Sequence, residues 1–256
     1  ADGLMYGMSE RSVLELANNL KHGKKGAAAC VGVRGTAYMA HDADGLAFNA
    51  VECPSYEDVC ADKADYARSV KLQYDEQDHV RGKALLQRHG RRVMIQNPPA
   101  KPLTTEEMDH VYALPYMRTY HPSYEALGGV PAIQEVQFSI IHNRGCFGAC
   151  NFCALAFHQG RYIQARSHES VIAEAKQIVQ MPGFKGYIHD VGGPTANFRF
   201  PACKQQEEHG LCKNKRCLFP SACKNLEADH TDYLNLLREL RQIEGIKKVF
   251  VRSGLR

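Results

Sequence analysis

The chain has 256 residues, of which 44% are hydrophobic and 23% are charged, and its formal net charge at pH 7 is +4. This composition is ordinary for a soluble globular protein of one large or two modest domains, and no apolar run approaches the ~20 residues of a membrane-spanning helix. The weak positive charge is spread along the chain, which argues against a nucleic-acid-binding surface.

Ten cysteines are the strongest compositional signal. The N-terminus lacks a basic stretch followed by an apolar one, so there is no secretory signal, and we expect a cytoplasmic protein. Disulfides need an oxidising compartment, which makes thiolates that bind a metal the better interpretation. The chain starts without Met on a strand-like segment, residues 2–7, which we expect to be buried. We therefore expect a fragment of a longer protein.

Residues 1–96 have an α/β pattern. Ser9 is a plausible N-cap of a first helix, and Val13 and Leu20 fall on its apolar face. Ser55 is placed to cap a second helix that runs to about residue 76. Short strands are expected between these helices, at residues 28–40 and 46–52.

Residues 97–133 are rich in proline and are predicted to be a linker or an irregular segment. Within it, Thr104 and Glu107 form a capping-box pattern, which predicts a short helix. We expect the boundary between two structural units in this segment.

Residues 134–256 alternate between strand and helix patterns. A strand is predicted at residues 135–141, a helix capped by Ser167 follows, and a second helix centres on Leu236. Further strands are predicted at residues 186–191 and 248–252, with a cysteine-rich insert at residues 200–225. Strands that alternate with helices predict parallel pairing through crossover connections.

One motif lies directly after the first of these strands. Cys146, Cys150 and Cys153 have the spacing Cys-x3-Cys-x2-Cys, in the segment RGCFGACNFC. Three thiolates this close can hold one corner of a cube-shaped iron–sulfur cluster, and Gly145 and Gly148 allow the loop to fold around it. Ordinary [4Fe-4S] clusters use four cysteines, so three leave one iron open to a substrate or cofactor.

This loop, including the aromatic residue Phe152, resembles the signature of the radical S-adenosylmethionine (SAM) superfamily. The resemblance implies a [4Fe-4S] cluster on Cys146, Cys150 and Cys153, with SAM bound to the open iron. It implies that an electron cleaves SAM to a 5′-deoxyadenosyl radical, and that a reductant such as flavodoxin or ferredoxin supplies the electron. Phe152 resembles the aromatic residue that lies near the adenine.

Two weaker matches extend the resemblance to the SAM site. Gly192, Gly193 and Thr195 resemble a Gly-Gly-Glu turn of the superfamily without its acid, or else form a simple glycine-rich turn. Ser253 follows the third strand and is a candidate contact for SAM. Beyond the loop, two arginines either pair with the SAM carboxylate or form surface ion pairs; they are Arg161 and Arg166.

Longer stretches resemble the YgiQ-like radical SAM proteins of bacteria, among them LMYGMSERSV, NPPAKPLTTEEMDHVYALPY and GIKKVFVRSG. This resemblance implies an α/β chain: the first three strands of a partial (β/α) radical SAM barrel, preceded by the tail of a cobalamin-binding-like domain. We expect such a fragment to be inactive alone. The resemblance names no substrate, and no catalytic residue is predicted.

A second cysteine group comprises Cys203, Cys212, Cys217 and Cys223. Four thiolates suit either structural zinc or an auxiliary iron–sulfur cluster, and reduced thiols without a metal are the alternative. Three scattered cysteines are predicted to be ordinary thiols, rather than the N-terminal cluster ligands of methylthiotransferases: Cys30, Cys53 and Cys60.

Two other functions remain open on these residues. One is a non-catalytic structural zinc module built on both cysteine groups. The other is an RNA-modifying enzyme resembling the methylthiotransferases, against which the weak basic charge argues.

Overall fold

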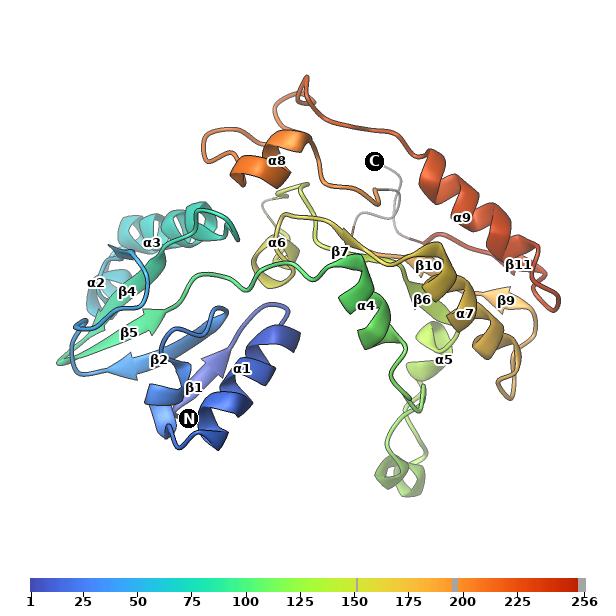
Figure 1. Ribbon diagram of the computed structural model, residues 1–256, viewed down its shortest axis with the longest axis horizontal. Coiled ribbons are helices and arrows are strands. Elements are labelled where there is room, and N and C mark those ends of the chain that lie inside the picture. The colour runs from blue at the N-terminus through green and yellow to red at the C-terminus, as the bar shows by residue number, and fades with distance from the viewer. Residues whose placement is uncertain (151, 195–197, 253–256) are drawn as a thin grey trace. The chain divides into compact units, whose positions relative to one another are not determined.

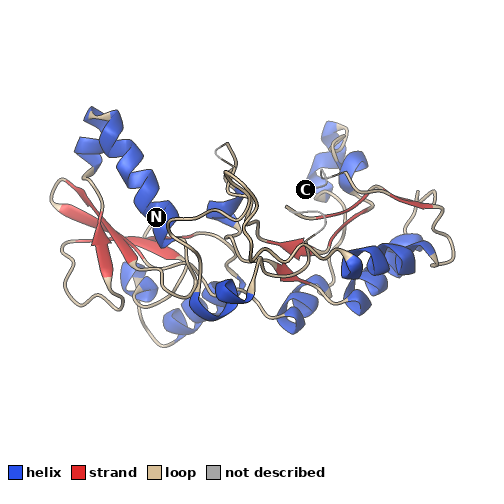
Figure 2. Ribbon diagram, turned by 90° about the horizontal axis from the view of Figure 1, so that it is seen from above, coloured by secondary structure: helices blue, strands red, loops and turns tan. Residues whose placement is uncertain are grey.

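The computed structural model describes residues 1–150, 152–194 and 198–252 (Figures 1 and 2). The chain divides into two compact units. Unit 1 comprises residues 1–102, 149–161 and 204–221, and unit 2 comprises residues 103–148, 162–203 and 222–256. No helix in the described residues has the length and apolar character needed to cross a membrane.

The described residues form short helices and strands. The helices are α1 (Glu10–Lys21), α2 (Tyr56–Ala61), α3 (Lys63–Glu76), α4 (Thr105–Tyr112), α5 (Ile133–Val136), α6 (Leu155–His158), α7 (His168–Val179), α8 (Lys204–His209) and α9 (Thr231–Arg241), with 3-10 segments η1 (Gly26–Cys30) and η2 (Pro122–Leu127). The strands are β1 (Gly3–Met5), β2 (Thr36–Ala40), β3 (Ala50–Glu52), β4 (Ala84–His89), β5 (Arg92–Gln96), β6 (Ser139–Ile141), β7 (Asn143–Arg144), β8 (Gln164–Ala165), β9 (Tyr187–Ile188), β10 (Asp190–Gly192) and β11 (Lys248–Val249).

Unit 1 is built on a five-stranded mixed sheet in the order β1-β2-β5-β4-β3. All neighbours pair antiparallel except β3 and β4, which are parallel. The helices α2 and α3 lie against β4, and η1 lies against β2 (Figure 1). The β4–β5 hairpin, whose turn contains Gly90 at φ 56°, was not predicted from the sequence. The core of unit 1 includes Cys30, Tyr38, Val93 and Ile95.

At the start of unit 1, one expectation was wrong and another was only partly correct. The first strand, β1, is exposed throughout rather than buried, because it is the edge strand of the sheet. The predicted apolar face of α1 is only partly buried: Leu16 packs against the core, whereas Val13 and Leu20 are exposed. The buried Ser12 donates to the Arg34 carbonyl at 2.7 Å. A hydrogen bond to a loop carbonyl and the packing of Leu16 against the core of the sheet therefore both hold this helix.

Helix caps follow the local sequence closely. Ser55 forms a full capping box with Asp58, and Thr104 forms one with Glu107, as predicted. The second predicted helix is broken at Asp62, whose carboxylate accepts the Ala64 N–H at 2.8 Å and starts α3. Because a cap needs only atoms within three residues, these starts are visible in the sequence.

Unit 2 contains parallel pairs, as predicted. Strand β6 pairs with β10 and strand β9 pairs with β11, and the Val191 N–H donates to the Phe250 carbonyl at 2.9 Å. The helices α7 and α9 pack together and against these strands (Figure 1). Their shared core contains Phe138, Ile140, Val171, Ala175, Ile178, Ile188, Val191, Tyr233, Leu236 and Leu240.

The predicted strand at residues 135–141 is only partly correct. Its first two residues belong to α5, at whose C-cap the Gln137 N–H donates to the Ile133 carbonyl at 2.8 Å. Strand β6 begins at Ser139, where pairing with Asp190 of β10 begins. Alternating polar and apolar residues become a strand only where a neighbouring strand offers hydrogen bonds. The α/β class is confirmed.

Candidate cluster-binding loop and its surroundings

The first cysteine of the motif, Cys146, lies in unit 2, directly after a glycine whose backbone packs closely against the Tyr162 carbonyl. Strand β7 pairs antiparallel with β8, and Gly145 follows with φ 85°. A Cβ atom on Gly145 would lie 2.0 Å from the Tyr162 carbonyl oxygen, so only glycine fits there. Cys146 is buried, and the Gly148 N–H points to its Sγ at 3.4 Å. The position of this thiol is therefore well defined.

The other two cysteines of the motif belong to unit 1. Ala149 has φ 51°, an uncommon left-handed conformation for a residue other than glycine. The Cys153 N–H donates to the Cys150 carbonyl at 3.0 Å, which closes a turn between the two thiols. Both are partly exposed, and α6 begins two residues later.

The predicted glycine pair ends β10 in unit 2. A Cβ atom on Gly193 would lie 1.5 Å from the Asn143 Oδ1 atom, and one on Gly192 would lie 2.3 Å from the Asp190 carboxylate. Asn143 directly precedes the loop and donates from Nδ2 to the Phe198 carbonyl at 2.8 Å. Glycine is thus required by close packing beside the strand that leads into the cysteine loop.

Arg166 forms a buried ion pair, which corrects the expectation of a surface pair. Its side chain is 1% exposed and pairs with Glu174, which also pairs with Arg118. Its Nη1 donates to the Ile141 carbonyl at 2.9 Å, and its Nη2 donates to the Ser170 hydroxyl at 2.9 Å. The guanidinium is therefore fully engaged in holding β6 and α7 together.

A second buried arginine extends this network, and nothing in its sequence context singles it out. Arg199 pairs with Asp232, and its Nη1 lies 3.2 Å from the His142 Nδ1 atom. The His142 ring stacks on Tyr233 at 4.8 Å, and burial raises the pKa of Tyr233 well above its ordinary value. These contacts stabilise the chain at His142, just before the cysteine loop.

Arg161, in unit 1, is also buried rather than on the surface. Its guanidinium lies 4.2 Å from the centre of the Tyr74 ring, and its Nη2 donates to the Tyr74 carbonyl at 3.3 Å. Phe152 is 90% exposed. Two predicted SAM contacts, Thr195 and Ser253, lie outside the described residues.

The second cysteine group is divided between the units: Cys212 and Cys217 belong to unit 1, Cys203 and Cys223 to unit 2. All ten cysteines lie in the described part of the chain, and none forms a disulfide there. In that same part, no group of three or more Cys, His, Asp or Glu side chains is assembled as a metal site. A metal site often takes its final shape only when the metal binds. The kind of donor atoms and their spacing in the sequence therefore test whether these cysteines suit a metal or a cluster.

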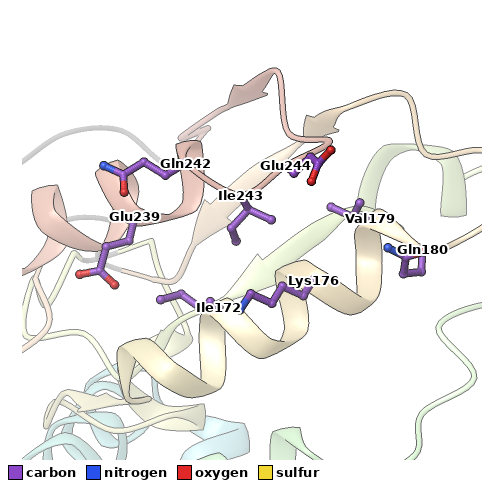
Figure 3. A pocket seen from close by; sticks show the side chains of 8 residues that line it. All are labelled: Ile172, Lys176, Val179, Gln180, Glu239, Gln242, Ile243 and Glu244. Carbon is purple, nitrogen blue, oxygen red and sulfur yellow. The ribbon is translucent and has the colours of Figure 1, made fainter.

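Two open pockets occur in unit 2. One of about 490 Å³ lies between the C-terminal ends of α7 and α9, with Ile172, Val179 and Ile243 beside Lys176 and Glu239 (Figure 3). The other, of about 360 Å³, lies between α4 and α7. No cysteine lines either pocket. Of the residues predicted to contact SAM, these two linings include Arg166, which lies in the smaller pocket.

Comparison with known proteins identifies the family. The model of the family described as Radical SAM N-terminal matches residues 1–139, more than half of the chain. The chain belongs to this family. The resemblance to the radical SAM superfamily, drawn above from the cysteine loop and the longer stretches, is confirmed.

Relatives of this radical SAM chain are similar over its whole length. A UPF0313 protein of Clostridium botulinum is 57% identical over 256 residues, which is 100% of this chain and 39% of that protein. A UPF0313 protein of Clostridium perfringens is 53% identical over 256 residues, which is 100% of this chain and 38% of that protein. The chain thus spans about two fifths of the length of these relatives.

Proposed function

We propose that the chain is the cluster-binding core of a radical SAM enzyme, with a [4Fe-4S] cluster on Cys146, Cys150 and Cys153. The observation that carries this proposal is the donor set: three thiols within eight residues, in a chain of the Radical SAM N-terminal family. Three thiolates suit a cubic cluster with one open iron. When bound, the cluster would supply the electron that cleaves SAM reductively.

The residues around the loop have separate tasks in this proposal. Gly145 allows the backbone to pass close to the Tyr162 carbonyl, and so sets where the Cys146 thiol lies. The partly exposed Cys150 and Cys153 thiols remain accessible for cluster insertion. Buried Arg166 fixes the end of β6 through the Ile141 carbonyl, so that the loop starts from a rigid strand.

Further parts of the proposal extend the resemblance. The parallel strands of unit 2 would be the first strands of a partial barrel, and unit 1 the tail of a cobalamin-binding-like domain. Phe152, Gly192, Gly193, Thr195 and Ser253 would contact SAM. The cysteine-rich insert would hold zinc or a second cluster, and a flavodoxin or ferredoxin would supply electrons. The substrate is left unassigned.

The test is anaerobic reconstitution with iron and sulfide, followed by iron analysis and EPR spectroscopy of the reduced protein with and without SAM. We expect about four irons per chain and a spectrum that changes with SAM, and about eight if the insert also holds a cluster. Separate Cys146→Ser, Cys150→Ser and Cys153→Ser variants should lose the SAM-sensitive signal. Cys60→Ser, a change to an exposed cysteine outside the motif, is the matched control.

Two results would reject the proposal. One is a wild-type protein that binds no iron while zinc saturates both cysteine groups, which would favour a structural zinc module. The other is a SAM-sensitive EPR signal that is retained in each of the three single motif variants.

A further inference from the structure

The turn between α3 and β4 carries two buried acids, Glu76 and Asp78, and both contact the cysteine-rich insert. We call residues 76–83 the acidic turn and residues 204–221 the insert segment; both belong to unit 1. Asp78 is 0% exposed, and its Oδ1 accepts the N–H groups of Val80 at 2.8 Å and Arg81 at 3.1 Å. Its Oδ2 accepts the N–H of Leu211 at 2.9 Å. One carboxylate thus shapes the turn and binds the insert segment.

The insert segment is shaped to meet this carboxylate. Gly210 has φ 77°, and a Cβ atom there would lie 2.6 Å from both Asp78 carboxylate oxygens. The next residue, Leu211, is buried, and its carbonyl accepts a hydrogen bond from Arg81. Both backbone groups of Leu211 are therefore held by two neighbouring side chains of the acidic turn.

A second acid of the turn holds the insert segment two residues further on. The Lys213 Nζ atom lies 2.7 Å from the Glu76 Oε1 atom, and the Glu76 side chain is nearly buried. The other Glu76 oxygen accepts the Lys83 N–H at 2.8 Å. Cys212 lies between the two bound residues, so the acidic turn fixes the chain on both sides of this thiol.

The chain around Cys153 is tied to the same region. The Gln77 side chain, inside the acidic turn, donates to the Phe157 carbonyl at 3.0 Å. From the insert segment, Gln206 donates to the Arg161 carbonyl at 2.9 Å, and Arg216 approaches the Ala149 carbonyl at 3.5 Å. Residues 152–161, which we call the loop segment, thus contact both the acidic turn and the insert segment.

We propose that the acidic turn is the device that positions the cysteine-bearing segments of unit 1, with Asp78 as its central positioning residue. The part of this proposal that concerns the cluster rests on the proposed function. Asp78 lies 72 residues before Cys150 and 134 before Cys212 in the chain, so their link is made only by folding. A buried carboxylate that accepts three backbone N–H groups is a rigid anchor, because each bond to a charged acceptor is stronger than a neutral one.

The test compares Asp78→Asn with Asp62→Asn in the full chain. Asparagine has the shape of aspartate, but its amide turns one acceptor into a donor that faces a backbone N–H. Asp62 is exposed and caps α3, where asparagine serves equally well, so it is the matched control. A second variant, Lys213→Met, keeps the stem and removes the pair with Glu76. Its control is Lys71→Met, which removes the exposed pair with Asp75.

The first readout is hydrogen exchange of the metal-free protein, which needs no cluster. We expect Asp78→Asn to speed exchange about tenfold in the insert segment and in the loop segment, as loss of a hydrogen bond to a charged group predicts. Lys213→Met should raise exchange in the same segments by less. Faster exchange confined to residues 76–83 would overturn the proposal. If Asp78→Asn does not fold, unchanged exchange in both segments of Lys213→Met would overturn it as well.

The second readout is the rate at which a chelator removes iron from the reconstituted protein. Residues that support metal ligands typically change metal affinity by about tenfold or more, so we expect iron to leave Asp78→Asn about tenfold faster than the Asp62→Asn control. Equal rates would refute the link between the acidic turn and the cluster. A wild-type protein without iron would instead reject the proposed function, and the exchange result alone would then decide on the acidic turn.

Discussion

Glu174 is expected to be a charged residue of unit 2 whose removal strongly lowers stability. Its side chain is 8% exposed and pairs with Arg118 and with Arg166, which is itself buried. Removing one partner of a buried ion pair costs about 3–5 kcal/mol, because the remaining charge stays buried. Arg166 keeps its bonds to Ser170 and to the Ile141 carbonyl, so we expect Glu174→Ala to lose about 3 kcal/mol, the low end of that range.

Thermal unfolding followed by circular dichroism measures this loss. At about 2–4 °C per kcal/mol for a protein of this size, the midpoint should fall by about 6–12 °C. The control is Glu135→Ala in the same unit, which removes a pair with Arg252 in which both side chains are more than half exposed. Exposed pairs contribute about 0–1 kcal/mol. Equal midpoints for the two variants would refute the assignment of Glu174 as a buried anchor.

Three further predictions concern single residues. Gly145→Ala should lower the urea midpoint of unfolding more than Gly23→Ala. Both glycines have φ near 86°, but only a Cβ atom at Gly145 would clash with a backbone carbonyl. Equal losses would mean that only the positive φ matters and would contradict a role for the clash. Cys53 is buried and burial raises the pKa of its thiol, so Cys53 should react with iodoacetamide more slowly than exposed Cys60, and equal labelling rates by mass spectrometry would contradict this. Burial raises the pKa of Tyr6 from 10.0 to about 12, so its share of stability is full below pH 10 and is lost as the pH rises through about 12. Tyr6→Phe should flatten that alkaline loss in denaturation curves, and an unchanged slope would contradict it.

The starts of the capped helices could be predicted from the sequence because capping interactions are local. The caps at Ser55, Thr104 and Ser167 join atoms within three residues, and the structure contains each of them. The apolar positions of α7 and α9 follow helical periodicity and form the core of unit 2, as expected. Three cysteines within eight residues likewise point to one ligand loop without any knowledge of the rest of the chain.

Tertiary structure alone decided which polar residues are buried and what they bind. The sequence left Arg166 as a partner of the SAM carboxylate or of a surface acid, and only the fold brings it together with Glu174 and Arg118. Asp78 carried no signal at all, because the Leu211 N–H that it binds lies 133 residues away. The helix α1 buries Ser12 more deeply than Val13 or Leu20, since the neighbouring loop presents the Arg34 carbonyl to the Ser12 hydroxyl.

The sequence by itself therefore determined the α/β class, the starts of the capped helices and the cysteine spacing on which the proposed cluster rests. The fold decided how the backbone around that loop is held: by Gly145 against the Tyr162 carbonyl, and by Gln77 of the acidic turn at the Phe157 carbonyl. The physical reason is distance along the chain. Caps and ligand spacing depend on neighbouring residues, whereas a buried charge is stable only beside a partner that folding brings from far away.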